Sequence, residues 1–156
     1  MKIINLTKDY AIEKANEILA LEHNWTEIGD ESWNIDNLLY ELPMKWELSY
    51  AALNEEEIVG YQIGSLKEEN AFLNKIIVDG NRRGIGIGRK LLRVFLDKCL
   101  YKNIERIKFR VRTDNPALRF YEGLGFERLE KIDYGRADKL PSYFYDTLIK
   151  RVIKNV

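Results

Sequence analysis

Three glycines alternate with isoleucines in Arg83-Gly84-Ile85-Gly86-Ile87-Gly88, near the middle of the chain. The residues just before this stretch, 71–78, are mostly apolar and predict a strand. The residues after it predict a helix of about four turns, because apolar side chains recur at helical spacing. Those side chains are Ile87, Leu91, Leu92, Phe95 and Cys99. The glycine-rich loop 83–88 therefore connects a strand to a helix.

This loop is suited to bind an anion such as a pyrophosphate. Glycine lets the backbone turn sharply and come close to a ligand, and the first turn of the following helix offers free N–H groups at the positive end of its dipole. The dinucleotide-binding pattern fails, because its last glycine would fall on Arg89, and the chain has no Gly-Lys-Ser/Thr triplet. From three glycines alone, a structural turn without a ligand is an equal alternative.

The periodicity of the flanking sequence predicts a mixed α/β domain of the α+β type. Expected strands cover residues 2–6, 46–53, 58–66, 71–78, 106–112, 126–134 and 142–151. Expected helices are one capped by Thr7, one ended by Pro43, one after the glycine-rich loop and one over residues 116–122. The strands between residues 46 and 78 are joined by charged turns and should form an antiparallel meander. Because no linker or repeat divides the sequence, we expect residues 1–156 to form a single domain.

Composition narrows the class of protein. The chain has 156 residues, of which 46% are hydrophobic and 32% charged, which is a globular balance. The net charge is zero, which does not favour nucleic acid as a partner. Cys99 is the only cysteine, so we expect no internal disulfide and no zinc or other metal site. The N-terminus has no signal-peptide core, and no apolar run approaches the ~18 residues of a membrane span. We expect a soluble, cytoplasmic protein.

A second motif follows the glycine-rich loop, Asn115-Pro116-Ala117-Leu118-Arg119-Phe120-Tyr121-Glu122-Gly123-Leu124-Gly125-Phe126. Asn115 is a good N-cap and Pro116 suits the first position of a helix. Gly123 or Gly125 can end that helix. The motif predicts a short capped helix between two strands.

Together the two motifs resemble the GNAT superfamily, the Gcn5-related N-acetyltransferases. Its central signature, Gln/Arg-x-x-Gly-x-Gly/Ala, is matched by residues 83–88. Its second motif, Asn-x-x-Ala-x-x-Phe-Tyr-x-x-x-Gly-Phe, is similar to residues 115–126, with a small difference in spacing because alanine stands at position 117. The resemblance is strong over residues 56–130. It implies a central, largely antiparallel seven-stranded sheet flanked by about four helices, and acetyl-CoA as the cosubstrate without a metal.

The resemblance also implies which residues hold acetyl-CoA. The main-chain N–H groups of the loop would bind the pyrophosphate, the strand before it would pair with the pantetheine arm where two parallel strands separate, and Asn115 would hydrogen-bond that arm. The implied cofactor-binding residues are Ile76, Ile77, Val78, Arg83, Gly84, Ile85, Gly86, Ile87, Gly88 and Asn115.

Acyl transfer to an amine sets three chemical needs. The amine must lose a proton, the tetrahedral oxyanion needs a hydrogen-bond donor, and the departing thiolate gains from an acid. The resemblance places Tyr121 near the sulfur as that acid, and a main-chain N–H near Val78 as the oxyanion donor. From the helical spacing alone, Tyr121 is better explained as a packed aromatic residue, and the resemblance reverses that preference.

No motif in the sequence identifies the base or the acceptor. The candidate bases are Glu27, Glu31, Glu47 and His23, each of which is also explained as a surface or packing residue. Candidate aromatic walls of an acceptor pocket are Trp25, Trp33, Tyr134, Tyr143 and Tyr145. A basic row, Arg106, Lys108, Arg110 and Arg112, could attract CoA phosphates, although a solvated strand face is the simpler interpretation. Cys99 is expected to be a buried hydrophobe rather than a nucleophile.

Three functions remain open at this stage. The first is acetylation of a primary amine of a small molecule by direct attack. The second is acetylation of a protein N-terminus or lysine, and the third is a CoA-binding module without catalysis. The expected partners are acetyl-CoA and an amine acceptor, with neither nucleic acid nor a membrane. The sequence leaves open whether the chain forms a homodimer.

Overall fold

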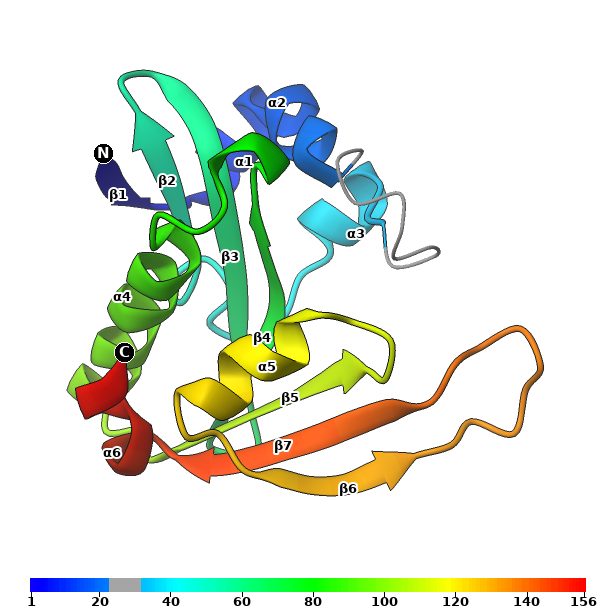
Figure 1. The fold of residues 1–156 in the computed structure, drawn as a ribbon. Coiled ribbons are helices and arrows are strands. Elements are labelled where there is room, and N and C mark those ends of the chain that lie inside the picture. The colour runs from blue at the N-terminus through cyan, green and yellow to red at the C-terminus, as the bar shows by residue number, and fades with distance from the viewer. Residues whose placement is uncertain (23–31) are drawn as a thin grey trace.

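The computed structural model describes residues 1–22 and 32–156, and its centre is one seven-stranded sheet (Figure 1). The strands are β1 (Lys2–Asn5), β2 (Tyr50–Asn54), β3 (Glu57–Lys67), β4 (Asn70–Val78), β5 (Arg106–Arg112), β6 (Arg128–Ile132) and β7 (Ser142–Leu148), in the order β1-β2-β3-β4-β5-β7-β6. Only β4 and β5 pair in parallel; the other neighbours are antiparallel. The predicted seven-stranded, mixed and largely antiparallel sheet is confirmed.

Helices cover both faces of this sheet. Within the described residues they are α1 (Lys8–Glu13), α2 (Ala15–Ala20), α3 (Ile35–Leu39), α4 (Ile87–Tyr101), α5 (Ala117–Gly123) and α6 (Ile149–Val152). The buried residues of α4, α5 and α6 share one core cluster, and those of α1, α2 and α3 share another with Tyr61 and Ile63 of β3 (Figure 1). In residues 1–22 and 32–156, no helix is long and apolar enough to cross a membrane.

Helix α4 is the longest element of the first core cluster. Its buried residues are Ile87, Leu91, Leu92, Phe95, Leu96 and Cys99. They form one apolar stripe, and full burial of each large side chain contributes roughly 1.5–3 kcal/mol. The helix begins inside the glycine-rich loop, at Ile87, and ends next to Asn103, whose positive φ of 62° suits a helix C-terminus.

The parallel strands β4 and β5 separate soon after they meet. Their register pairs only Ala71 with Ile107 and Phe72 with Lys108, although β4 continues to Val78 and β5 to Arg112. Beyond Phe72, the edge of β4 that faces β5 has no strand partner. The separation that the family resemblance implied is therefore present.

The strand expected over residues 46–53 begins later, at Tyr50. Residues 43–48 turn instead: Met44 has a φ of 57°, and the N–H of Leu48 donates to the carbonyl of Met44 at 3.0 Å. Lys45 is buried in this turn, and its Nζ donates to the carbonyls of Leu38 and Tyr40 at 2.7 and 2.6 Å. A tertiary contact to α3 thus replaces strand pairing here.

Two further elements differ from expectation. The last strand stops at Leu148 rather than Arg151, because Ile149 and Val152 are both buried at helical spacing in α6. The first predicted helix is interrupted at Lys14, so α1 and α2 are separate; Thr7 caps α1 as predicted, accepting from the N–H of Tyr10.

Candidate functional site

A cavity of about 130 Å³ occupies the space where β4 and β5 separate. One wall comes from β4, another from β5, and α5 together with Asn115, two residues before it, supplies a third. Glu22, two residues after the end of α2, reaches the same cavity. Its lining residues are Glu22, Ser32, Leu73, Asn74, Lys75, Ile76, Ile77, Phe109, Arg110, Val111, Asn115, Ala117 and Tyr121. The cavity therefore joins the open edge of β4 to groups from distant parts of the chain.

Strand β4 carries a bulge within the cavity wall. Lys75 pairs with Ile63 and Leu73 pairs with Gly64, so Asn74 is an extra residue without a register partner on β3. Its side-chain oxygen accepts a hydrogen bond from the Ser65 hydroxyl at 2.7 Å. Of the strand residues expected to contact acetyl-CoA, Ile76 and Ile77 line the cavity and Val78 does not. The wall thus ends before Val78, where we had expected the oxyanion donor.

The glycine-rich loop continues directly from β4. Gly84 and Gly86 have φ values of +81° and +88°, which L side chains rarely adopt. A Cβ at either position would meet no atom within 4 Å, so the surface above both glycines is open. The first intrahelical hydrogen bond of α4 runs from the N–H of Lys90 to the carbonyl of Gly86. The N–H groups that precede Lys90 in the first turn therefore have no partner within the helix. With no acidic residue in that turn, the loop is suited to an anion.

Asn115 holds the start of α5. Its side-chain oxygen accepts from the N–H of Ala117 at 2.9 Å, and its carbonyl accepts from Leu118. The regular helix starts two residues later than Asn115, yet the predicted capping contact is present. Because Asn115 also lines the cavity, one side chain can fix the helix and face a ligand.

Tyr121 lines the cavity from within an aromatic cluster. Its ring centroid lies 4.6 Å from that of Phe109, 5.9 Å from Phe126 and 6.2 Å from Tyr145. Burial raises the pKa of the Tyr121 hydroxyl, so the group stays protonated at neutral pH. The two interpretations of Tyr121 are compatible: it is packed on its ring and can still donate a proton at the cavity.

Glu22 is the site residue that the sequence did not indicate. It is 3% exposed, accepts from the Tyr61 hydroxyl at 2.5 Å through Oε1, and pairs with Lys75 Nζ at 3.2 Å through Oε2. Lys75 Nζ also lies 5.2 Å from the centre of the Trp33 ring. Glu22, Trp33, Tyr61 and Lys75 form what we call the Glu22 cluster. A lysine within the apolar strand 71–78 was the available signal, because a buried cation requires a partner.

Other predicted site residues lie elsewhere. Glu47 pairs with Lys102 at 3.1 Å, is more than half exposed and does not line the cavity, so this site gives it no role as a base. Tyr134 packs on Lys139, Tyr143 on Arg128 and Tyr145 on Phe109, all outside the cavity lining. The remaining candidates, His23, Trp25, Glu27 and Glu31, fall outside the described residues.

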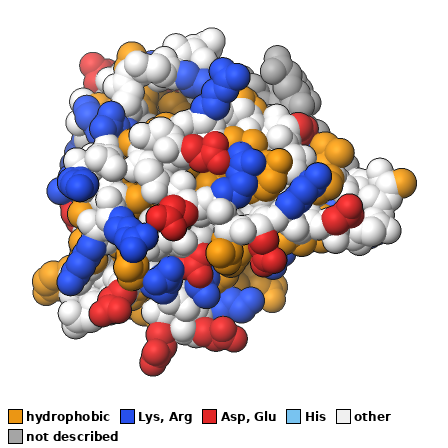
Figure 2. All heavy atoms as spheres, turned by 60° about the horizontal axis from the view of Figure 1, so that its bottom comes forward, with side chains coloured by type: hydrophobic (Ala, Val, Ile, Leu, Met, Phe, Trp, Pro, Cys, Tyr) orange, Lys and Arg blue, Asp and Glu red, His pale blue; other side chains and the backbone are white. Residues whose placement is uncertain are grey.

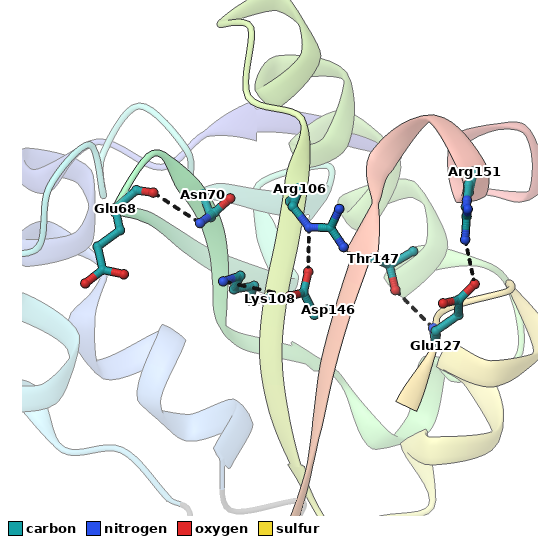
Figure 3. Close-up of polar contacts among 8 residues, drawn as sticks. All are labelled: Glu68, Asn70, Arg106, Lys108, Glu127, Asp146, Thr147 and Arg151. Carbon is teal, nitrogen blue, oxygen red and sulfur yellow. Dashed lines mark hydrogen bonds and ion pairs between the residues drawn. The ribbon is translucent and has the colours of Figure 1, made fainter. Parts of the chain in front are cut away.

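The basic row on β5 is largely neutralised by acidic neighbours. Arg106 and Lys108 both reach Asp146 of β7, at 2.8 and 3.8 Å (Figure 3). Arg112 pairs with Asp114. Figure 2 shows acidic and basic side chains interspersed over this end of the molecule rather than gathered by sign. Arg110 alone of the row lines the cavity. The simpler interpretation, a solvated strand face, therefore holds for Arg106 and Lys108.

Cys99 is fully buried on the inner side of α4, as predicted. Burial raises the pKa of its thiol to about 12, which leaves it protonated and unreactive. It does not line the cavity and is no nucleophile for this site.

Comparison with known proteins agrees with this geometry. A stretch of N-alpha-acetyltransferase 30 from Saccharomyces cerevisiae is 31% identical over 62 residues, covering 39% of this chain and 35% of that protein. Ribosomal-protein-S18-alanine N-acetyltransferase from Escherichia coli has the same fold, with a TM-score of 0.77 at 20% identity over 95% of this chain and 93% of that one. An aminoglycoside 6'-N-acetyltransferase complexed with coenzyme A gives a TM-score of 0.74 at 15% identity, over 96% and 97%.

The chain spans about a third of the length of the curated relatives it matches. A family model matches residues 13–126 of this chain, a range that includes the separated strands, the glycine-rich loop, Asn115 and Tyr121. On that match the chain belongs to the acetyltransferase (GNAT) family.

Proposed function

We propose that this chain transfers an acetyl group from acetyl-CoA to the primary amine of a small molecule, by direct attack of the amine on the thioester. One observation carries the proposal: a single cavity is bordered by the open edge of β4, by Tyr121 and by the Glu22 carboxylate. Acyl transfer to an amine needs a surface for the donor, an acid for the leaving thiolate and a group that accepts the amine's proton. All three border the same small space.

The loop and the strand edge fit acetyl-CoA, which supplies the activated acetyl group. The first turn of α4 with the open surface at Gly84 and Gly86 suits the pyrophosphate. The unpaired edge of β4 at Ile76 and Ile77 suits the amide groups of the pantetheine arm, since an extended chain can add there as a strand would. Asn115 stands where its side chain can bind the same arm.

Tyr121 is proposed as the acid. Its hydroxyl keeps its proton at neutral pH because burial disfavours the phenolate. It can therefore give that proton to the sulfur as the C–S bond breaks. The bulge at Asn74 makes the main chain of β4 at the cavity irregular, and we assign the oxyanion donor to this wall, 73–77, in place of Val78.

A second acceptor class is favoured by a specific observation. The sequence match to N-alpha-acetyltransferase 30 and the fold likeness to the S18-alanine enzyme both point to the amine at a protein N-terminus. The aminoglycoside enzyme of the same fold supports a small molecule. A cavity of about 130 Å³ admits an amine and the few carbons next to it, which suits a small acceptor or the first residue of a peptide.

The test is a transfer assay with both classes. The protein is incubated with acetyl-CoA and a library of primary amines, including peptides with free N-termini, and acetylated products are identified by mass spectrometry. Transfer to small amines supports the first proposal, and transfer only to peptides supports the second. If coenzyme A binds in calorimetry but no amine is acetylated, the chain is a CoA-binding module and both are wrong.

A further inference from the structure

Glu22 is the only carboxylate among the described residues that line the cavity. The other ionisable residues on its wall are Lys75, Arg110 and Tyr121. Lysine and arginine are cationic at neutral pH, and Tyr121 keeps its proton. A primary amine reaches the site mostly as an ammonium ion, which cannot attack a thioester. Within the described wall, Glu22 is therefore the side chain with the charge and the lone pairs to receive that ion.

We infer that Glu22 binds the ammonium group of the acceptor and takes its first proton, while Tyr61 and Lys75 hold the carboxylate in place. The inference rests on the proposed function and names the residue that recognises the acceptor. Tyr61 is fully buried and donates to Oε1, so it fixes the rotation of the carboxylate. Lys75, 11% exposed, sits at Oε2 and offsets the cost of burying the negative charge. A carboxylate oxygen can accept two hydrogen bonds, so Oε2 can accept from the ammonium group of the acceptor as well as from Lys75.

The protons and bonds balance in this scheme. The ammonium gives one proton to Glu22, which later passes it to water. The neutral amine forms a C–N bond to the acetyl carbonyl carbon, and the C–S bond breaks. Tyr121 gives its proton to the sulfur and regains one from the nitrogen, which becomes the amide. The net products are the acetamide, free coenzyme A and one proton.

A competing explanation is that Glu22 and Lys75 are only a structural ion pair. Removal of one partner from a buried pair leaves an uncompensated charge and destabilises the fold, whereas replacement of both is close to neutral. Glu22→Gln alone would therefore confuse a loss of stability with a loss of acceptor binding. The double variant Glu22→Gln/Lys75→Met separates them, because it removes both charges. Glu17→Gln is a matched control: Glu17 also pairs with a lysine, Lys14 at 3.5 Å, but is exposed and outside the cavity lining.

Two readouts follow these variants. The first is binding of tyramine, putrescine and the dipeptide amide Ala-Phe-NH₂ to the complex with coenzyme A, with tyrosol as the uncharged partner of tyramine. The second is kcat/KM for any of these amines that is acetylated. Glu22→Gln should weaken amine binding and lower kcat/KM about 100-fold, change the Kd of coenzyme A less than about twofold, and leave tyrosol unaffected. The double variant should regain stability but not amine binding, and Glu17→Gln should match the wild type.

Different results would overturn the role of Glu22 and the proposed function. Recovery of amine binding or kcat/KM in the double variant overturns the inference, because a structural pair then explains Glu22. Wild-type amine binding in Glu22→Gln overturns it as well, as does a wild-type complex that binds none of the three amines. If the wild type binds amines through Glu22 but transfers no acetyl group, the inference stands and the proposed function is wrong.

Discussion

The glycine-rich loop is proposed to bind acetyl-CoA and the Glu22 cluster to bind the amine acceptor, yet the two regions are built in opposite ways. The loop is local: six consecutive residues shape a main-chain surface, and two positive φ values, +81° and +88°, favour glycine. The Glu22 cluster is assembled from side chains far apart, with 39 residues separating Glu22 from Tyr61. A main-chain site suits a cosubstrate that does not change within a family, whereas a side-chain site can change residue by residue with the acceptor. Substitutions on each side should therefore affect different substrates.

Gly86→Val should give the largest effect and bear only on the loop. Valine at a φ of +88° is strained, which forces the loop to rearrange, and its side chain would occupy the open surface where the pyrophosphate is expected. We expect coenzyme A affinity to fall on the order of 100-fold or more, measured by calorimetry, with the fold checked by circular dichroism. The matched control is Gly123→Val, at a glycine without positive φ and with open space. Unchanged affinity in a folded Gly86→Val variant contradicts the assignment of the loop.

Tyr121→Phe tests the chemical step separately from the binding of coenzyme A and of the amine. The ring and its contacts to Phe109 and Phe126 are kept, so stability should change by less than about 0.5 kcal/mol. Loss of the proton donor should lower kcat about 100-fold, at the low end of general acid catalysis, because a thiolate is a fair leaving group. The Kd of coenzyme A and the binding of amines should stay unchanged. Wild-type kcat, under conditions where the chemical step limits the rate, would exclude the acid role.

Asn115→Asp tests whether the cavity side of Asn115 contacts the cofactor. Aspartate can still accept from the N–H of Ala117, so the thermal midpoint should stay within about 2 °C of the wild type. The lost amide donor should weaken coenzyme A about tenfold, which corresponds to about 1.4 kcal/mol. Amine binding at the Glu22 cluster should not respond. A drop in thermal stability without a change in affinity means that Asn115 is only a cap.

Gly88→Ala has the smallest expected effects, which are a gain in stability and a loss of coenzyme A affinity. An alanine Cβ would lie 3.6 Å from Val78 Cγ2, an ordinary contact, and alanine should stabilise the first turn of α4 by up to about 1 kcal/mol. The same methyl group would crowd an anion held at that turn, so coenzyme A affinity should fall a few fold. Urea unfolding and calorimetry on one preparation measure both quantities. A gain in stability with unchanged affinity places the pyrophosphate away from Gly88.

The contrast between the two regions also explains which features could be predicted from sequence. Alternation and helical spacing identified most strands, α4 and the loop, because these depend on local geometry and on one buried face. The turn at residues 43–48 was missed, since it depends on Lys45 reaching the carbonyls at the end of α3. The continuation of β7 to Arg151 was wrong because burial of Ile149 and Val152 at helical spacing ends the strand.

Glu22, the proposed base, could not be singled out from the sequence for the same reason. Glu22 looks like any acidic residue near a helix end until β3 and β4 bring Tyr61 and Lys75 against it. Glu47, which seemed equivalent, meets Lys102 at the opposite end of α4 from the glycine-rich loop and is solvent-exposed. Pairing between distant strands, and not the residue type, decides which carboxylate faces the cavity.

The burial of Cys99 gives the protein a built-in chemical reporter. It is the only thiol of the chain, and with a pKa of about 12 almost none of it is present as the thiolate that attacks disulfide dyes. In the native state such a dye therefore registers only the coenzyme A released by turnover. Without acetyl-CoA, the same dye reacts only with molecules in which α4 has left the sheet. The labelling rate then measures how often the core beneath the glycine-rich loop opens.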